Sequence, residues 1–317
     1  MHRPPAGGGA MLTLGEVHTG FLRNSTSVSP VRSARVLAIV EGERVRHSAR
    51  PLPYAVSPDI LRGVDCRLVA ASGARHRTIG TVVTRAAITG GHVLQGSAFT
   101  RVVSSGTDRR LSWPHYLTRP GVVETLGKVD WGDLADGFLS EAYPPESLDL
   151  SAICTEVMHQ VQASSDLDQK APLRTGRTHL RWAALDGDEP ILFAIEERGL
   201  RTLRLPAGTR DASAIAEVCA DLALHDWLLS CLQSLIEASD IGAVERAQVV
   251  RRFGPAIDHL LHLWMPAARV DRAVWEALER RPGMTRQWVA SVNRIRDQVA
   301  AGTMAMLSES VAGTRHS

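Results

Sequence analysis

The alternation of apolar and polar positions in the first hundred residues predicts β-strands. In His76–Thr89, successive side chains fall on opposite faces of a strand, and Gly90-Gly91 supplies a tight turn into a second strand over His92–Val103. Shorter β-prone runs, bounded by Gly, Pro or Ser, are Arg35–Val40, Leu52–Val56 and Val64–Ala70. Short strands with frequent turn residues predict a small barrel or sandwich.

The pattern changes in the second half of the chain. Apolar residues recur at helical spacing over residues 149–164, and Asp149 is placed to cap that helix. Three strands are predicted next, over Thr178–Leu185, Pro190–Glu196 and Leu200–Leu205. Their short connections predict an antiparallel three-stranded meander.

The remainder has helical periodicity. Asp211–Ala238 is apolar on most sides, which predicts a central buried helix. Further helices are predicted over Ala243–Trp264, which should break near Gly254-Pro255, over Asp271–Arg281 and over Thr285–Leu307. The predicted class is α+β, with an N-terminal β-rich barrel or sandwich followed by a C-terminal helix–three-stranded meander–helical bundle.

A chain of 317 residues has room for two domains. We expect a flexible tail over residues 1–10 and a basic β-rich domain over 11–110, with Met11 as an alternative start. A connector arm is expected over 111–148, an α+β domain with a helical C-terminus over 149–310, and a second tail over 311–317.

Basic and acidic residues are concentrated in different parts of the chain, although the net charge is only +2. Residues 1–120 hold sixteen Arg against six acidic residues, and residues 121–170 hold ten acidic residues against two Lys. Such segregation favours a partner that is a polyanion, an acidic protein or the acidic segment itself. The candidate binding residues are Arg44, Arg46, Arg67, Arg75, Arg77, Arg85 and Arg101.

Nucleic acid is one such polyanion. Small β-barrels bind single strands with a basic groove and aromatic platforms. Before residue 105 the only aromatic residues of the Phe, Tyr and Trp type are Phe21, Tyr54 and Phe99. Phosphate contact without stacking predicts salt-sensitive binding. A protein-facing role for the arginines is therefore favoured, with nucleic-acid binding as the alternative.

One local cluster has residue types suited to a metal ion. His225 and Asp226 are adjacent, and His259 and His262 share a helix face at i, i+3 spacing. These four residues define a third hypothesis, a metal-dependent hydrolase. Paired histidines in Leu-rich helices are more often packing residues, and a complete set of ligands is not visible.

Other catalytic and cofactor motifs fail on spacing. Gly121–Lys128 lacks the spacing of a phosphate-binding loop, and Ser97 lacks the second glycine of a nucleophile elbow.

The four cysteines form no CxxC pair, which favours reduced thiols in a cytoplasmic protein. No apolar run reaches membrane-spanning length. We expect no cofactor, no membrane partner and no catalytic residues.

Tryptophans gather towards the C-terminus. Trp264, Trp275 and Trp288 lie within the predicted helices of the last third. They are candidate interface residues, because Trp is enriched where proteins dock. Packing in the core is the alternative interpretation of the same residues.

Several segments resemble an actinobacterial family of uncharacterised proteins. They are Leu12–Gly20, Tyr54–Pro58, Gly63–Cys66, Ala71–Arg75, Trp113–Lys128 and Leu224–Leu229. The resemblance spans residue 11 to about residue 307. Genes of this family are neighbours of genes for a P-loop protein and a methyltransferase-like protein, so the resemblance implies a partner among such proteins. The leading hypothesis is a non-enzymatic adaptor or scaffold subunit of a multi-protein system.

Overall fold

The computed structural model describes residues 12–49, 51–107, 109–140, 144–188, 190–196, 199–238, 246–280 and 283–314. The strands are β1 (Leu12–Phe21), β2 (Arg46–Ser48), β3 (Tyr54–Val56), β4 (Ile60–Val69), β5 (Arg75–Thr89), β6 (Val93–Ser104), β7 (Val122–Thr125), β8 (Thr178–Leu185), β9 (Leu192–Ile195) and β10 (Leu200–Pro206). The predicted tail over residues 1–10 lies outside the described residues.

The helices are α1 (Pro30–Val36), α2 (Trp113–Leu117), α3 (Trp131–Leu139), α4 (Leu150–Gln162), α5 (Ala212–Glu237), α6 (Arg246–His259), α7 (Pro266–Arg269), α8 (Arg272–Arg280) and α9 (Met284–Thr314). A short 3₁₀ helix, η2, covers Leu261–Leu263. The predicted α+β class is confirmed. None of the described helices is long and apolar enough to cross a membrane.

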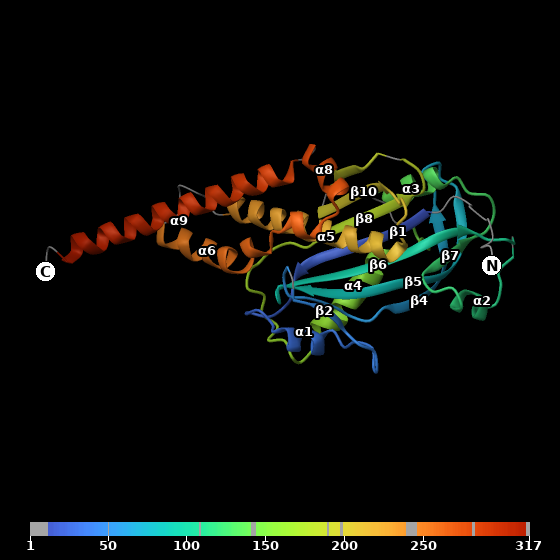
Figure 1. Ribbon diagram of the computed structural model, residues 1–317, viewed down its shortest axis with the longest axis horizontal. Coiled ribbons are helices and arrows are strands. Elements are labelled where there is room, and N and C mark those ends of the chain that lie inside the picture. The colour runs from blue at the N-terminus through green and yellow to red at the C-terminus, as the bar shows by residue number, and fades with distance from the viewer. Residues whose placement is uncertain are drawn as a thin grey trace, which may run out of the picture.

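The strands of both halves join in one sheet of ten strands (Figure 1). Its order is β2-β3-β5-β7-β6-β1-β8-β10-β9, and β4 also pairs with β5. The central strand β1 pairs antiparallel with β6 on one side and with β8 on the other. The predicted separate barrel or sandwich is therefore wrong, because β1 pairs with a strand from beyond the expected boundary near residue 148.

The predicted meander is also wrong. Strand β10 lies between β8 and β9, parallel to β8 and antiparallel to β9. Parallel neighbours need a crossover of about a dozen residues or more. The stretch of sequence between β8 and β10, with β9 within it, is long enough for that crossover, whereas the prediction considered each short loop by itself.

Helices cover both faces of the sheet. Leu12 and Leu14 of β1 belong to the apolar core beneath α3 and α4, whereas Val17 belongs to the core beneath α5. Alternation along the strand thus supplies two cores from one segment. At Gly96 of β6 a Cβ would lie 2.6 Å from Met158 Cγ, so the glycine permits close packing of α4.

Two local predictions failed for identifiable reasons. Residues 30–36 form α1 where a strand over Arg35–Val40 was expected, because Ser29 caps the helix and Pro30 occupies its first turn. The predicted helix break near Pro255 is absent from α6, which continues to His259. Packing of α6 against α9 offsets the intrahelical hydrogen bond that Pro255 cannot donate.

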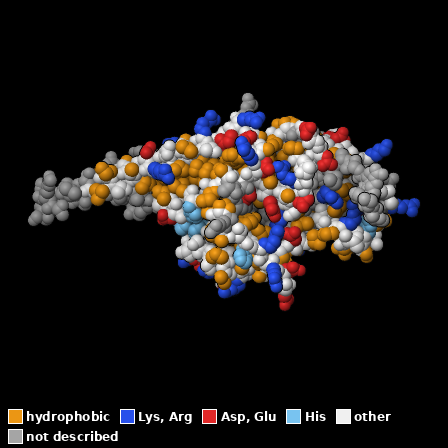
Figure 2. Space-filling view, viewed as in Figure 1, with side chains coloured by type: hydrophobic (Ala, Val, Ile, Leu, Met, Phe, Trp, Pro, Cys, Tyr) orange, Lys and Arg blue, Asp and Glu red, His pale blue; other side chains and the backbone are white. Residues whose placement is uncertain are grey.

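The C-terminal helices project beyond the sheet (Figure 1). Helix α9 has 31 residues and runs alongside α6, and it ends at Thr314, within the segment expected to be a tail. Figure 2 shows apolar side chains gathered over this projection. Val289 of α9 is 49 % exposed.

Candidate functional site

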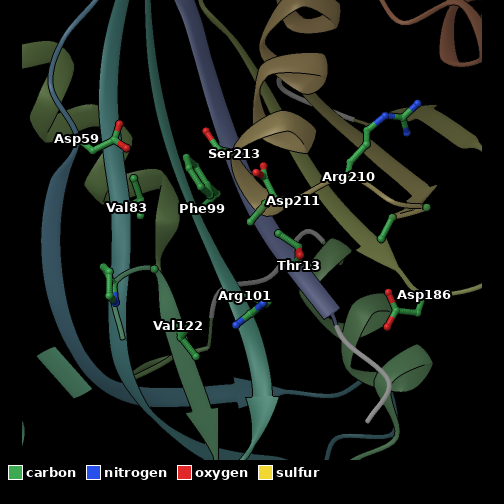
Figure 3. Close-up of a pocket in the computed structure, with 15 residues that line it drawn as sticks. Thr13, Asp59, Val83, Phe99, Arg101, Val122, Asp186, Arg210, Asp211 and Ser213 are labelled. Carbon is green, nitrogen blue, oxygen red and sulfur yellow. The ribbon is translucent and has the colours of Figure 1, made fainter. Parts of the chain in front are cut away.

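A cavity of about 340 Å³ lies where α5 begins, on the sheet face that α5 covers (Figure 3). Its floor includes Thr13 of β1, Phe99 of β6 and Val122 of β7. One wall is the first turn of α5. The opposite wall is the end of a segment, residues 109–121, that contains α2 and is called here the 109–121 arm.

Most charged side chains around this cavity have partners. Arg85 is 4 % exposed, donates from Nη1 to Ser213 Oγ at 3.1 Å and lies 3.9 Å from an Asp59 carboxylate oxygen. Arg210 pairs with Asp271 at 2.6 Å. Asp211 caps α5, because its Oδ1 accepts a hydrogen bond from the backbone amide of Ala214 at 2.8 Å.

Arg101 of β6 differs from these residues. It lines the cavity and is partly exposed, yet its Nε is shielded from water and has no hydrogen-bond partner. Among the described residues, no side chain forms an ion pair or hydrogen bond with its guanidinium. A dehydrated donor without a partner is costly and needs an explanation.

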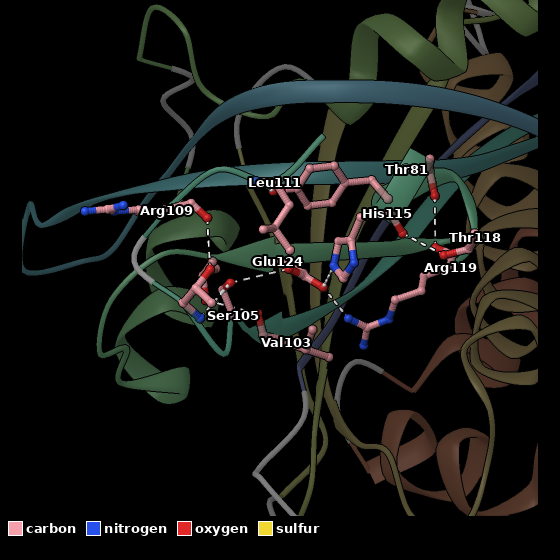
Figure 4. Close-up of polar contacts among 12 residues, drawn as sticks. Thr81, Val103, Ser105, Arg109, Leu111, His115, Thr118, Arg119 and Glu124 are labelled. Carbon is pink, nitrogen blue, oxygen red and sulfur yellow. Dashed lines mark hydrogen bonds and ion pairs between the residues drawn. The ribbon is translucent and has the colours of Figure 1, made fainter. Parts of the chain in front are cut away.

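Next to the cavity, a buried carboxylate anchors the 109–121 arm to the sheet (Figure 4). Glu124 of β7 is 4 % exposed and accepts a hydrogen bond from Arg119. His115 Nε2 lies 3.0 Å from the same carboxylate oxygen, and Ser105 Oγ lies 3.4 Å from the other. The charged acceptor therefore ties three separate positions of the chain together.

Thr81 of β5 holds the end of the arm to the sheet through two hydrogen bonds. Its hydroxyl donates to the carbonyl of Arg119 at 3.3 Å and accepts from the amide of Gly121 at 2.9 Å. Gly121 has φ +71°, and a Cβ there would lie 2.8 Å from Val83 Cγ2. The turn that forms the cavity wall is thus fixed by sequence at one glycine and one threonine.

The outer surface of the arm and the adjoining strand β4 carry exposed apolar side chains, called here the α2 patch: Leu61 of β4 and Leu111, Trp113 and Leu117 of the arm. These side chains are 44, 37, 36 and 58 % exposed, respectively. The Trp113 ring lies over Gly63 of β4, where a Cβ would approach it to 3.2 Å. Arg110 lies over the Trp113 ring, with its Cζ 5.8 Å from the ring centroid.

The seven predicted arginines do not form one groove. Arg46 pairs, through β3, with the end of β5, whereas Arg75 begins that strand. At about 3.3 Å per residue, the twelve-residue separation along β5 corresponds to about 40 Å of strand.

The remaining members of this set are distributed among other partners. Arg77 pairs with Asp65 at 3.2 Å, and Arg67 lies 3.6 Å from Glu146. Arg44 is exposed in the loop before β2. Arg67 and Arg77 are cross-strand neighbours that line the open groove along β4, whereas Arg101 lines the cavity.

The four predicted metal ligands have other contacts. His225 Nδ1 lies 2.6 Å from the carbonyl of Asp221, and its Nε2 accepts from the amide of Met265 at 3.3 Å. Asp226 is paired with Arg201 at 2.9 Å, and burial raises the pKa of its carboxyl group while Arg201 opposes this shift. Both nitrogens of His225 are thus engaged, as expected of a packing histidine.

The other two histidines meet a residue outside the predicted set. His259 Nδ1 lies 3.2 Å from Nε2 of His92, which follows the Gly90-Gly91 turn. Burial, with His259 and His262 nearby, lowers the pKa of His92 to about 4. Sequence spacing gave no indication of this contact, because His92 and His259 belong to different layers.

The three tryptophans pack on one another. Trp264 stacks on Trp288 at 4.2 Å and meets Trp275 edge-on at 5.8 Å between ring centroids. Trp288 is 6 % exposed and belongs to the core beneath α5. Trp264 and Trp275 are partly buried against that core, so much of each ring is already covered.

A second polar cluster, missed in the sequence, lies between the sheet and α4. The Glu16 cluster consists of Glu16 and His18 on β1 and His179 and Arg181 on β8. Arg181 Nε lies 3.3 Å from Glu16 Oε2, and the His18 and His179 rings stack at 3.9 Å. Burial, then His18, lowers the pKa of His179 to about 4.

Glu16, His18 and His179 are the only described residues that bring three potential metal-ligand atoms within 4.8 Å of one another. Each candidate atom of Glu16 and His18 is already engaged: Glu16 pairs with Arg181, and His18 Nε2 lies 3.0 Å from Glu16 and 3.1 Å from Ser151 Oγ. The imidazole rings are also nearly parallel, at 10°. This geometry fits a charge-paired cluster better than a metal centre.

No family model, no curated protein and no solved structure matches this chain. The resemblance to the actinobacterial family therefore stays a prediction. The interpretation of the site depends on its own geometry, namely the Arg101 cavity, the anchored 109–121 arm and the α2 patch.

Proposed function

We propose that this chain is a non-enzymatic adaptor or scaffold subunit that binds a protein partner through the α2 patch. The observation that carries the proposal is the concentration of four exposed, large apolar side chains on the 109–121 arm and the adjoining strand β4. Compact exposed apolar patches with a polar rim are typical of protein-docking surfaces.

The anchoring of the arm supports this role. Trp113 is held between Gly63 below and Tyr116 beside it, with ring centroids of Trp113 and Tyr116 5.9 Å apart. Tyr116 is 2 % exposed and accepts from the amide of Leu111. A pre-positioned aromatic ring loses little conformational entropy on binding, which suits an interface anchor.

The rim of the patch indicates the chemistry of the partner. Arg109 and Arg110 are exposed beside it, and Arg110 and Arg77 share the carboxylate of Asp65. Two arginines per acid leave a positive rim around an apolar centre. The partner segment that fits is apolar with flanking acidic residues. The resemblance suggests that a P-loop protein or a methyltransferase-like protein carries it.

The test is a tagged pull-down from native cells at moderate salt, treated with nuclease and measured by quantitative mass spectrometry. A near-stoichiometric partner is expected with the wild type. The double variant Trp113→Ala, Leu117→Ala should lose most of it, because two truncated anchors together cost several kcal/mol of binding. Binding is then reconstituted with the purified partner.

The matched control is Leu192→Ala with Ile195→Ala on the edge strand β9. These side chains are 56 and 58 % exposed, so their truncation removes similar apolar surface elsewhere. Equal loss of partner in both double variants, or no stoichiometric protein in any sample, would contradict the proposal. Recovery of nucleic acid alone, before nuclease treatment, would favour the alternative of a nucleic-acid-binding subunit.

A further inference from the structure

We propose that the Arg101 cavity binds a small molecule that carries a single carboxylate group. This inference concerns the opposite side of the 109–121 arm from the α2 patch and does not depend on the adaptor role. It rests on the cavity, on the unpartnered guanidinium at its floor and on the charge of the remaining lining residues.

The first step is the state of Arg101. Its Nε is shielded from water and has no acceptor among the described residues, so this one donor of the partly exposed guanidinium has lost hydration that no described residue replaces. An arginine in such surroundings is stabilised by an anion that accepts two parallel hydrogen bonds. Arg85, its neighbour on the same face, has Ser213, Asp59 and Glu217 around it and needs no further acceptor.

The second step is the charge of the ligand. Three carboxyl groups, those of Asp59, Asp186 and Asp211, also line the cavity. Because these acids repel anions, a singly charged carboxylate in contact with Arg101 meets less repulsion than a doubly charged phosphate. The same carboxylates can accept hydrogen bonds from an ammonium or hydroxyl group, so an amino acid or hydroxy acid is the class that fits.

The third step is size. A cavity of about 340 Å³ lies at the lower end of the range for small-molecule sites. Phe99 and Val83 provide an apolar floor, while the hydroxyl of Thr13 offers a further polar contact. This combination of apolar surface and few convergent polar groups distinguishes the cavity from the open charged groove along β4 (Asp65, Arg67, Arg77, Glu146).

The experiment measures thermal unfolding of the full chain at constant ionic strength. The probes are acetate, free amino acids, short hydroxy acids and inorganic phosphate, with chloride as the reference. Carboxylates with an amino or hydroxyl group should raise the midpoint most. Affinity for the best probe, measured by calorimetry, should fall at least about tenfold in Arg101→Met, because a charge-assisted hydrogen-bonded pair is lost.

The matched control is Arg75→Met, which removes the same charge from an exposed arginine at the start of β5. It should bind the probe as the wild type does. A second measurement follows the Arg101 Nε–H resonance by NMR, which should shift on addition of the probe and identify contact independently of stability.

Three outcomes would overturn the inference. The first is the absence of a response to every probe. The second is equal binding by the wild type and Arg101→Met. The third is tighter binding of phosphate than of any carboxylate, which would reject the assigned class of ligand.

Discussion

The Glu16 cluster and the Arg101 cavity lie on opposite faces of the same central strands, and they differ in whether their charged side chains have partners. In the Glu16 cluster a carboxylate is 1 % exposed and meets a guanidinium that is 3 % exposed. Arg181 also donates to the carbonyls of Phe138 and Ser140 at the end of α3. In the cavity, the Arg101 side chain has no protein partner among the described residues.

The difference separates two uses of buried charge. A charge that is fully paired fixes the position of elements, since breaking the pair leaves its partner stranded in a poorly solvated place. A charged group with an unpartnered, shielded donor adds no stability to the fold and is able to receive a ligand. By burial alone, the Glu16 cluster would be the stronger candidate for a ligand-binding site. Because its charges are paired and Arg101 is not, the Arg101 cavity is the stronger candidate.

The largest expected effect comes from breaking the paired side of this comparison. Arg181→Met should lower the free energy of unfolding by about 3–5 kcal/mol, because Glu16 is left buried without its cation. Urea denaturation measures this. The double variant Arg181→Met, Glu16→Gln should recover part of the loss, and a double variant that is no more stable than the single one would show that the pair is not the cause.

Acid should weaken the same cluster. The pKa of His179 is about 4 in the folded protein and 6.5 ordinarily, so the folded state favours the neutral ring. The stability it contributes is complete above pH 6.5 and is lost as the pH falls towards 4. For His179 this loss is at most about 3 kcal/mol.

The pH dependence of the urea midpoint tests this expectation. His179→Gln should flatten the curve between pH 6.5 and 4 but not abolish its slope, because His92 has a similarly lowered pKa. A curve for His179→Gln that is parallel to that of the wild type would be inconsistent with a neutral, buried His179.

A smaller effect is expected at the anchor of the 109–121 arm. Glu124→Gln keeps the shape but removes the charge that Arg119 and His115 contact, which should cost about 1–3 kcal/mol. Limited proteolysis should cut within the arm faster in this variant. Glu146→Gln, at a side chain that is 72 % exposed, is the control and should behave as the wild type.

The smallest effect is expected for Arg101→Met without ligand. Because no described side chain pairs with Arg101 and its shielded Nε lacks an acceptor, the variant should lose no stability and should gain about 1 kcal/mol at most. Urea denaturation beside Arg181→Met makes the comparison direct. A loss as large as that of Arg181→Met would mean that Arg101 is a structural residue and that the two regions do not differ.

Local sequence patterns predicted the elements better than their arrangement. The hairpin of β5 and β6 follows from alternation and Gly90-Gly91, α4 begins after its predicted cap Asp149, and α5 begins next to the predicted helix start at Asp211. The pairing of β1 with β8 could not be predicted, because it joins residues such as Glu16 and Arg181 that no local signal connects.

The candidate site was predicted only in part. Arg101 belonged to the predicted basic set, but nothing in the sequence separated it from arginines such as Arg77, whose partner Asp65 lies across a strand pair. His18 and His179 were missed because each is a lone histidine in its own strand. Partnering depends on tertiary contacts, so a sequence can propose charged residues but cannot say which of them remain unpaired.

The central position of β1 has a consequence for synthesis of the chain. When β1 leaves the ribosome, neither of its neighbours is available until β6 and then β8 emerge, the latter ending at Leu185. At 5–20 residues per second, roughly 10–30 s separate β1 from its second partner. During that interval an apolar strand has open edges, so the nascent chain should depend on chaperones and fold slowly for its size.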